Sequence, residues 1–194
     1  MSSQWPVILT SNELTLRPLR FRDRKQWNSV RVQNREWLTP WEATIPVLPE
    51  KFGGPELSSE LPSFYEMVRT FNREGRHERS FSFAIFHEKT LIGQISLGGV
   101  IYGAMRAGHI GYWIDRHYAN KGYTTQAVQM LTNYAFNELA LHRVEINLRP
   151  ENTASRRVAE KAGYVLEGER PRYLHIDGGW RDHLSFVKEN PALK

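Results

Sequence analysis

The segment from Ala107 to Leu139 constrains the fold more than any other part of the chain. AGHIGYWI (107–114) is typical of a strand, and NKGYTT then leads into a helical pattern with a single glycine between them. The apolar stripe of that helix consists of Ala127, Val128, Leu131, Tyr134, Ala135 and Leu139. A strand followed by an amphipathic helix indicates a mixed α/β layout.

The remaining pattern extends this layout along the chain. Strands are predicted at 13–19, 80–86, 91–102 and 143–149, and helices at 22–32, 63–74 and 152–164. A last hairpin turns at DGG (177–179). We expect a single α/β (α+β) domain over 1–194. Its mixed, mostly antiparallel central sheet should have about 6–7 strands, flanked by about four helices.

Helix ends and one loop have their own signals. Ser63 and Asn152 are N-cap candidates, and Gly163 suits the residue after a helix C-terminus. Residues 46–62 hold four prolines and two glycines. They predict a mobile surface loop that can lie over a site.

Composition excludes several kinds of chemistry. The chain has no cysteine, which excludes disulfides, thiolate metal sites and a cysteine nucleophile, and suits a reducing cytoplasm. The seven histidines include no HExxH, so no metal is predicted. No apolar run approaches the roughly 18 residues of a membrane span, and the N-terminus lacks a signal-peptide pattern. We therefore expect a cytoplasmic protein with no membrane contact.

The chain is basic, with a formal charge of +5 and a sequence pI of about 9.6. Such a surface attracts nucleic acid, acidic protein or a phosphorylated small molecule, although it also serves ordinary solubility. No basic cluster is interleaved with aromatic residues, so no direct nucleic-acid binding is expected.

The NKGYTT stretch contains the parts of a pyrophosphate site. A helix N-terminus presents unpaired N–H groups and partial positive charge, and Gly122 lets an anion approach the backbone. Lys121 adds a full charge, and Thr124 and Thr125 add hydroxyl groups. The stretch matches neither G-x-x-x-x-G-K-[ST] nor G-x-G-x-x-G. Its own residues therefore leave two interpretations open, a phosphate cradle and a plain helix start.

The flanking segments resemble the acetyl-CoA-dependent GNAT acetyltransferase superfamily, and within it the ribosomal-protein N-acetyltransferases. HIGYWIDRHYANKGYTTQAV is similar to that family's fourth strand, phosphate loop and following helix, and HRVEINLRPENTASRRVAEKAGYVLEG to the strand, helix and strand that come next. LTLRPL, WLTPWE and DGGWRDH fit the same branch. The resemblance implies the GNAT fold and transfer of an acetyl group from acetyl-CoA to an amine.

The resemblance also implies a cofactor site. The loop residues Lys121, Gly122, Tyr123, Thr124 and Thr125 would hold the pyrophosphate of acetyl-CoA. The strand residues Tyr112, Trp113 and Ile114 would pair with the pantetheine arm and supply oxyanion donors, and Asn152 would contact that arm or serve only as a cap. Ala119 departs from the family pattern, which has Gln or Arg there.

Direct attack by an amine needs a proton acceptor and a group that protonates the departing thiolate. His109 occupies the position where related chains often have a carboxylate, so it is the candidate base; the alternative is an ordinary strand histidine. Glu145 and Asp115 are weaker candidates. Ser155 matches the family's acid position, although a first-turn serine also suits a helix cap.

The acceptor is left open between a protein N-terminus, with a ribosomal protein as possible partner, and a small amine such as a polyamine, amino acid or antibiotic. A third hypothesis is a non-catalytic acyl-CoA-binding domain. Two interpretations remain for three tryptophans, Trp37, Trp41 and Trp180. They line an acceptor pocket, or they pack in the hydrophobic core.

Overall fold

The computed structural model describes residues 5–47 and 62–193. The strands are β1 (Leu9–Thr10), β2 (Leu14–Arg17), β3 (Phe81–His87), β4 (Thr90–Ile101), β5 (Ala107–Ile114), β6 (Arg143–Leu148), β7 (Val165–Ile176) and β8 (Gly179–Glu189). The α-helices are α1 (Arg24–Gln33), α2 (Arg35–Leu38), α3 (Phe64–Arg76), α4 (Tyr123–Asn137) and α5 (Thr153–Lys161), and short 3₁₀ turns cover Phe21–Asp23, Thr39–Trp41 and Arg116–Tyr118.

All eight strands form one sheet in the order β1-β2-β3-β4-β5-β6-β8-β7. Only the β5–β6 pair is parallel, so the expected mostly antiparallel sheet is confirmed. The expected number of strands was slightly too low. β1 has two residues, too few for an alternating pattern to be recognised in the sequence.

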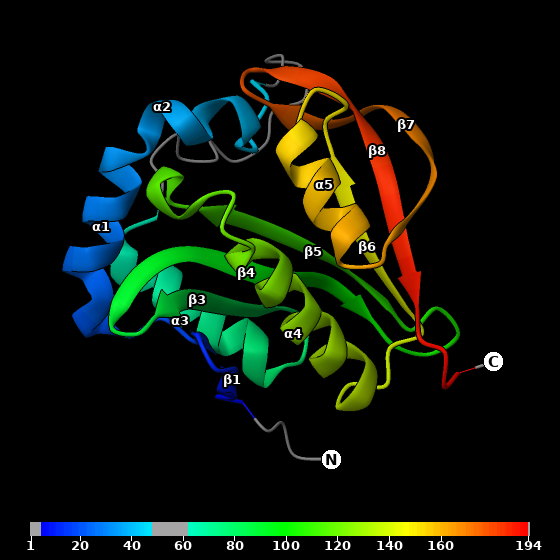
Figure 1. The fold of residues 1–194 in the computed structure, drawn as a ribbon, viewed down its shortest axis with the longest axis horizontal. Coiled ribbons are helices and arrows are strands. Elements are labelled where there is room, and N and C mark those ends of the chain that lie inside the picture. The colour runs from blue at the N-terminus through cyan, green and yellow to red at the C-terminus, as the bar shows by residue number, and fades with distance from the viewer. Residues whose placement is uncertain (1–4, 48–61, 194) are drawn as a thin grey trace.

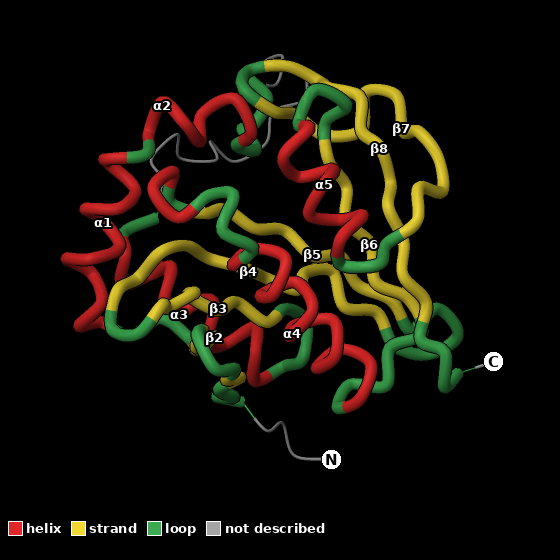
Figure 2. Tube along the Cα trace, viewed as in Figure 1, coloured by secondary structure: helices red, strands yellow, loops and turns green. Residues whose placement is uncertain are grey.

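Helices cover both faces of the sheet, as the ribbon in Figure 1 and the trace in Figure 2 show. The helices α4 and α5 lie on one face, and α3 lies on the other. The helix α1 continues into α2 at the end of the molecule where the C-terminal hairpin of β7 and β8 also turns. This arrangement places the strand–loop–helix unit of β5 and α4 in the middle of the fold.

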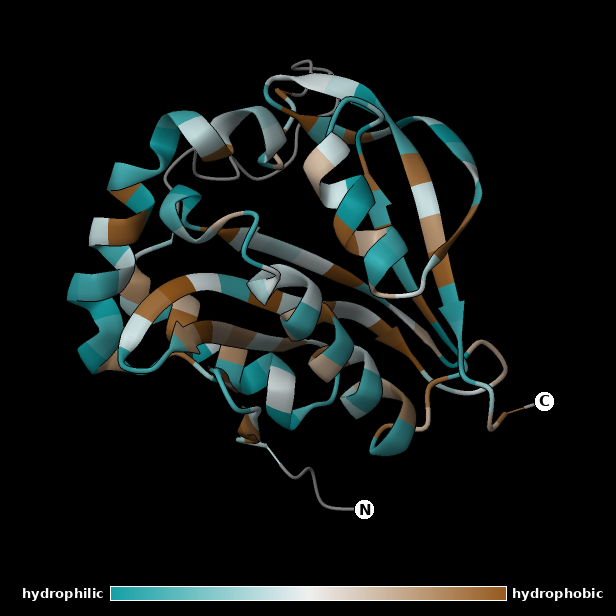
Figure 3. Cartoon of the chain, viewed as in Figure 1, coloured by the Kyte–Doolittle hydropathy of each residue, from teal (hydrophilic) through white to brown (hydrophobic). Residues whose placement is uncertain are grey.

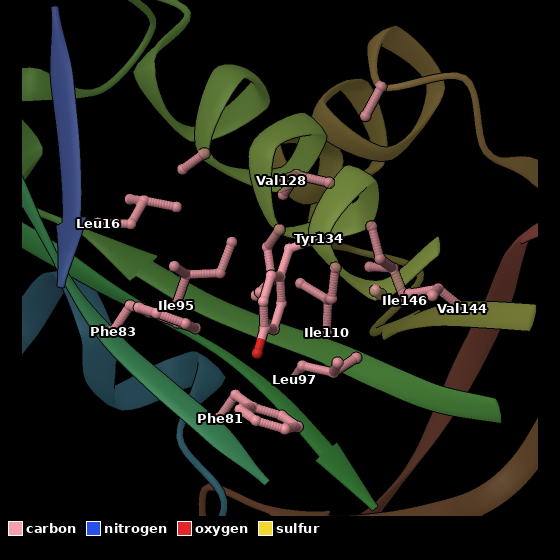
Figure 4. Close-up of a cluster of buried hydrophobic side chains, with 14 of the residues drawn as sticks. Leu16, Phe81, Phe83, Ile95, Leu97, Ile110, Val128, Tyr134, Val144 and Ile146 are labelled. Atoms are coloured by element: carbon pink, nitrogen blue, oxygen red, sulfur yellow. The ribbon is translucent and has the colours of Figure 1, made fainter. Parts of the chain in front are cut away.

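The core is built by the apolar stripe of α4 on the sheet. Val128 and Tyr134 point toward β-strand residues such as Ile95 and Ile110 (Figure 4), and all four are buried. The Tyr134 ring meets Phe81 edge-on at 5.6 Å between centroids. Figure 3 shows hydrophilic residues along the outer surfaces of the helices, as their amphipathic pattern requires.

Side-chain caps begin α3 and α5, whereas α1, α2 and α4 begin without a side-chain cap bond. The Ser63 side chain and Glu66 form a capping box at α3, and the Asn152 side chain accepts a hydrogen bond from the Ser155 N–H at α5. Gly163 has φ of 84° just after α5, as predicted. The helix α4 begins at Gly122 with no side-chain cap. Its first N–H groups are therefore left for another partner.

The last hairpin and a loop at residues 46–62 were both predicted from the sequence. β7 begins at Val165 and reaches Ile176 through two irregularities in register, so the last hairpin is longer than its clearest sequence pattern. The mobile loop expected at 46–62 falls almost entirely outside the described residues. Within the part of the chain that the structure describes, no helix has both the length and the apolar character to cross a membrane.

Candidate active site

The strands β5 and β6 separate soon after they meet. They pair at Ala107 with Arg143, Gly108 with Val144, and His109 with Glu145. Beyond these pairs, β6 continues against β8, and β5 continues against β4. Residues 110–114 of β5 therefore have no strand on their β6 side among the described residues, and we call this stretch the open edge.

Strand alternation shows which backbone groups face the open edge. The Asp115 N–H donates to the Ile92 carbonyl on the β4 side at 2.7 Å, whereas the Ile114 carbonyl accepts from Trp37 Nε1 at 3.2 Å. Successive residues of a strand alternate in direction. Tyr112 and Ile114 thus direct their backbone toward the open edge and Trp113 toward β4. An extended ligand can add to such an edge as a further strand.

The loop after β5 leaves the start of α4 uncapped and open. Gly122 has φ of 85° and ψ of −10°, a left-handed conformation that favours glycine, and the first helical bond runs from the Gln126 N–H to the Gly122 carbonyl. Gly122 is exposed, and a Cβ there would meet no atom within 4 Å. The N–H groups of Tyr123, Thr124 and Thr125 are thus presented beside open space.

Contacts that sequence reasoning missed hold this loop in place. The Tyr123 hydroxyl lies 3.1 Å from Nε2 of His87, the last residue of β3. Lys121 Nζ lies 5.1 Å from the centre of the Tyr118 ring, a cation–π contact. The Asp115 carboxylate accepts from the His117 N–H at 3.0 Å. No local sequence signal connects His87 with Tyr123, because they are 36 positions apart.

His109 lies where β5 and β6 separate. Its side chain is exposed and rests on the Gly98–Gly99 bulge of β4. A Cβ on Gly98 would stand 3.0 Å from the imidazole Nε2, and one on Gly99 would stand 2.8 Å from Cε1. The two glycines thus make room for the ring. Burial of part of the ring lowers the pKa of His109, so the imidazole is neutral at neutral pH and can accept a proton.

The two alternative carboxylates, Glu145 and Asp115, are less suited to accept a proton. Glu145 accepts from Arg143 Nε at 2.8 Å and from Arg170 Nη2 at 2.7 Å. Burial alone would raise the pKa of Glu145, but the Arg143 hydrogen bond and the Arg170 charge outweigh it and lower that pKa. Hydrogen bonds from His117 likewise outweigh burial and lower the pKa of Asp115. These contacts favour His109 as the base.

The N-terminus of α5 faces the same edge. The Tyr112 phenol donates to the Ser155 carbonyl oxygen at 3.2 Å, which ties β5 to α5 on the side where strand pairing has ended. Burial raises the pKa of Tyr112 to about 12, and its contact with Ser155 offsets part of that rise, so the phenol keeps its proton. Asn152 caps the helix through a 2.9 Å bond from the Ser155 N–H. The structure thus brings Tyr112, Asn152 and Ser155 together.

A segment containing α2 and Thr39–Trp41 spans the ends of the separated strands. It contacts β5 through Trp37, and Arg149, directly after β6, donates to the Pro40 carbonyl at 3.0 Å. Thr44 then binds the β7–β8 hairpin, where its N–H donates to the His175 carbonyl at 2.9 Å. We call residues 35–44 the strap, because it joins β5, β6 and the hairpin.

The three tryptophans proposed for an acceptor pocket lie on or beside the strap. Trp37 contacts the open edge, Trp41 lies under the Arg149 guanidinium, and Trp180 meets the His175 ring edge-on at 5.6 Å. All three are at least one third exposed, so packing in the core does not account for them. Across residues 5–47 and 62–193, no group of three or more histidine, aspartate or glutamate side chains is placed to hold a metal ion.

The open edge, the uncapped α4 N-terminus and the neutral imidazole of His109 together form the candidate site. The acetyltransferase (GNAT) domain family matches residues 13–165. The chain therefore belongs to this family and is an acetyl-CoA-dependent acetyltransferase, as the motifs of its sequence implied.

Individual relatives indicate which members of the acetyltransferase family the chain is similar to. The chain is 37% identical over 155 residues to the probable N-acetyltransferase YjcK of Bacillus subtilis (strain 168), covering 70% of this chain and 86% of YjcK. It is 31% identical over 187 residues to the ribosomal protein uS5 alanine N-acetyltransferase of Escherichia coli (strain K12), covering 95% and 92%. Among solved structures, Mycobacterium smegmatis RimJ in complex with CoA-disulfide superposes with a TM-score of 0.87 at 32% identity, covering 100% and 92%.

Proposed function

We propose that this protein acetylates the N-terminal α-amine of a protein, with a ribosomal protein as the acceptor, in the cytoplasm and through a single domain. The observation that carries the proposal is the open edge of β5, which runs from His109 toward the uncapped N-terminus of α4. Similarity to the uS5 alanine acetyltransferase and to RimJ supports this acceptor class over other amines.

The cofactor roles follow from the same geometry. The N–H groups at the start of α4, from Gly122 to Thr125, and the Lys121 ammonium hold the pyrophosphate of acetyl-CoA. The pantetheine arm adds to the open edge along Tyr112 and Ile114. The structure of RimJ with CoA-disulfide supports this cofactor assignment.

The transfer needs no covalent enzyme intermediate. Neutral His109 takes the proton from the acceptor amine, directly or through water, as the amine nitrogen attacks the thioester carbonyl carbon. Backbone N–H groups of Tyr112 and Ile114 stabilise the oxyanion. When the C–S bond breaks, the thiolate sulfur takes the proton of the Ser155 hydroxyl. The serine oxygen regains a proton from solvent, and His109 releases its proton to solvent. The products are an N-acetyl amine and CoA thiol.

Thiol release across a panel of acceptors tests the proposal. We expect rapid release of CoA thiol with peptides that carry ribosomal-protein N-termini, and little with N-terminally blocked copies, polyamines, free amino acids or aminoglycosides. Mass spectrometry should place the acetyl group on the α-amine. Preferred turnover of a small amine would identify a different acceptor class, and acetyl-CoA binding without turnover of any acceptor would identify a binding domain.

Asn152 permits a test that separates capping from cofactor binding. Asn152→Ala should lower the free energy of unfolding by about 1 kcal/mol, because the Ser155 N–H loses its acceptor. Asn152→Asp should keep that stability, since a carboxylate oxygen can accept the same bond, but should weaken acetyl-CoA binding because the amide donor is gone. Chemical denaturation and isothermal titration measure the two effects.

The Ser63→Ala variant is the matched control for this test. It removes the corresponding cap of α3 and should cost a similar amount of stability while leaving acetyl-CoA binding unchanged. Unchanged acetyl-CoA affinity in Asn152→Asp would leave Asn152 with a capping role only.

A further inference from the structure

The C-terminal hairpin places a charged side chain beside the candidate base. Arg170 lies on β7, the outermost strand beyond β6 and β8 (Figure 1), and its Nη2 donates to Glu145 Oε2 at 2.7 Å. Glu145 is the register partner of His109 in the last pair of the β5–β6 ladder. Arg170 therefore binds the residue that pairs with His109, although Arg170 and His109 are 61 positions apart in the sequence.

Several contacts hold Glu145 and Arg170 in place. Arg143 Nε donates to the other Glu145 oxygen at 2.8 Å, and Asn147 Nδ2 donates to Glu145 Oε2 at 3.4 Å. The Ser185 hydroxyl in turn donates to Asn147 Oδ1 at 2.6 Å. The Arg170 guanidinium lies 4.8 Å from the centre of the Tyr173 ring. A charge held in this way keeps its position relative to His109.

Charged side chains from two strands act electrostatically on His109. β6 contributes the Glu145 carboxylate, and β7 contributes the Arg170 guanidinium. The β4 neighbours, Gly98 and Gly99, are uncharged. The two charges have opposite effects, because a carboxylate favours the imidazolium form and a guanidinium disfavours it.

We propose that Arg170 is a positioning residue for acetyl transfer: it neutralises Glu145 and thereby keeps the His109 imidazole in its neutral, proton-accepting form. This role rests on the proposed function of His109 as the base. Arg170 belongs to the β7–β8 hairpin, whose His175 carbonyl accepts from the Thr44 N–H of the strap. The hairpin that binds the strap therefore also contributes to the protonation of the base.

Single substitutions on either side of the ion pair should have opposite effects. In Arg170→Gln, fewer positive charges offset the Glu145 carboxylate, so the pKa of His109 should rise by about 0.5 pH unit. The change is modest because the Arg170 side chain is one third exposed and water screens its charge. Glu145→Gln should lower the same pKa. Arg170→Lys keeps the charge and should restore most of the wild-type value. NMR titration of the imidazole signals, assigned by their loss in His109→Ala, measures each value.

Kinetics then tests whether this protonation matters for transfer. The acid limb of the kcat/KM profile should move to higher pH in Arg170→Gln and to lower pH in Glu145→Gln, while kcat/KM at high pH changes little in Arg170→Gln. The Arg73→Gln variant removes one positive charge from α3, where Arg73 pairs with Glu74, and should leave both measurements unchanged.

The outcomes separate this inference from the proposed function. An unchanged NMR titration of His109 in both variants would overturn the role of Arg170. If the titration moves in the expected directions and the kinetic limb follows, both assignments are supported. If the titration moves but the kinetic limb does not, Arg170 does not act on transfer through His109, and another group is the base. Absence of turnover in the wild type would contradict the proposed function alone, since the NMR measurement does not depend on it.

Discussion

Replacing His109 with alanine should lower kcat/KM for acetyl transfer about 100-fold or more, the usual contribution of a positioned general base. The imidazole is partly exposed and partly covered at the point where β5 leaves β6, and the alternative carboxylates, Glu145 and Asp115, are ionised and bonded to other groups. Binding of acetyl-CoA should be unchanged, because the backbone of the open edge and the α4 N-terminus remain. A thiol-release assay measures kcat/KM, and isothermal titration measures the affinity for acetyl-CoA.

The pH dependence of this effect has a defined sign. The folded protein lowers the pKa of His109 below its ordinary 6.5, mainly through burial. The neutral, active form therefore dominates above that lowered pKa, and wild-type kcat/KM should fall as the pH drops below it. The acid limb should disappear in His109→Ala.

Two variants control for indirect effects. His109→Glu supplies another proton acceptor at the same place and should retain part of the activity, and His77→Ala, at the exposed end of α3, should have no effect. Loss of acetyl-CoA binding together with the rate in His109→Ala would indicate a structural role for the ring.

Replacing Gly122 with valine should weaken acetyl-CoA binding about 10-fold or more. A β-branched residue at φ of 85° is strained by about 1–2 kcal/mol, and every 1.4 kcal/mol is a tenfold change in Kd. Without acetyl-CoA, the loop of the variant relieves the strain by leaving the left-handed conformation. The free energy of the strain therefore reduces binding affinity, because the bound pyrophosphate requires the original loop conformation. The added side chain also enters the open space beside the α4 N–H groups. Isothermal titration with acetyl-CoA provides the measurement.

Gly103→Val is the matched control for the loop. Gly103 has φ of 74° and equally open surroundings in the β4–β5 connection, so its strain should be similar. It lies outside the phosphate loop and should leave acetyl-CoA affinity unchanged. Equal loss of affinity in both variants would point to general destabilisation. Wild-type binding should also weaken with added salt, because Lys121 and the helix N-terminus act through charge.

The local motifs of the site were recognisable in the sequence because each lies within a short stretch. The predicted caps Ser63 and Asn152 and the left-handed Gly163 are confirmed. The apolar stripe of α4 is confirmed from Ala127 to Ala135, but Leu139 lies beyond the end of the helix at Asn137. The two-residue β1 was missed, since strand periodicity needs several residues to be visible. The roles of His109 and Ser155 remain predictions.

Contacts between distant segments needed the fold. The Tyr112 bond to Ser155 joins a strand to a helix 43 positions away, and the contact between Tyr123 and His87 links the start of α4 to the end of β3. Such pairs have no common local pattern. Their partners become neighbours only when the sheet order places the segments side by side.

The sequence by itself determined the class of fold, the order of the longer strands and helices, the family, and the glycine at the start of α4, because periodicity, capping and turn chemistry act over a few residues. The tertiary structure alone decided where β5 and β6 separate, which backbone groups face the open edge, and which charges surround His109. Those properties depend on the parallel pairing of two strands and on arginines from β6 and β7 that converge on Glu145. Electrostatic effects on a side chain follow distance in space, and only packing sets that distance.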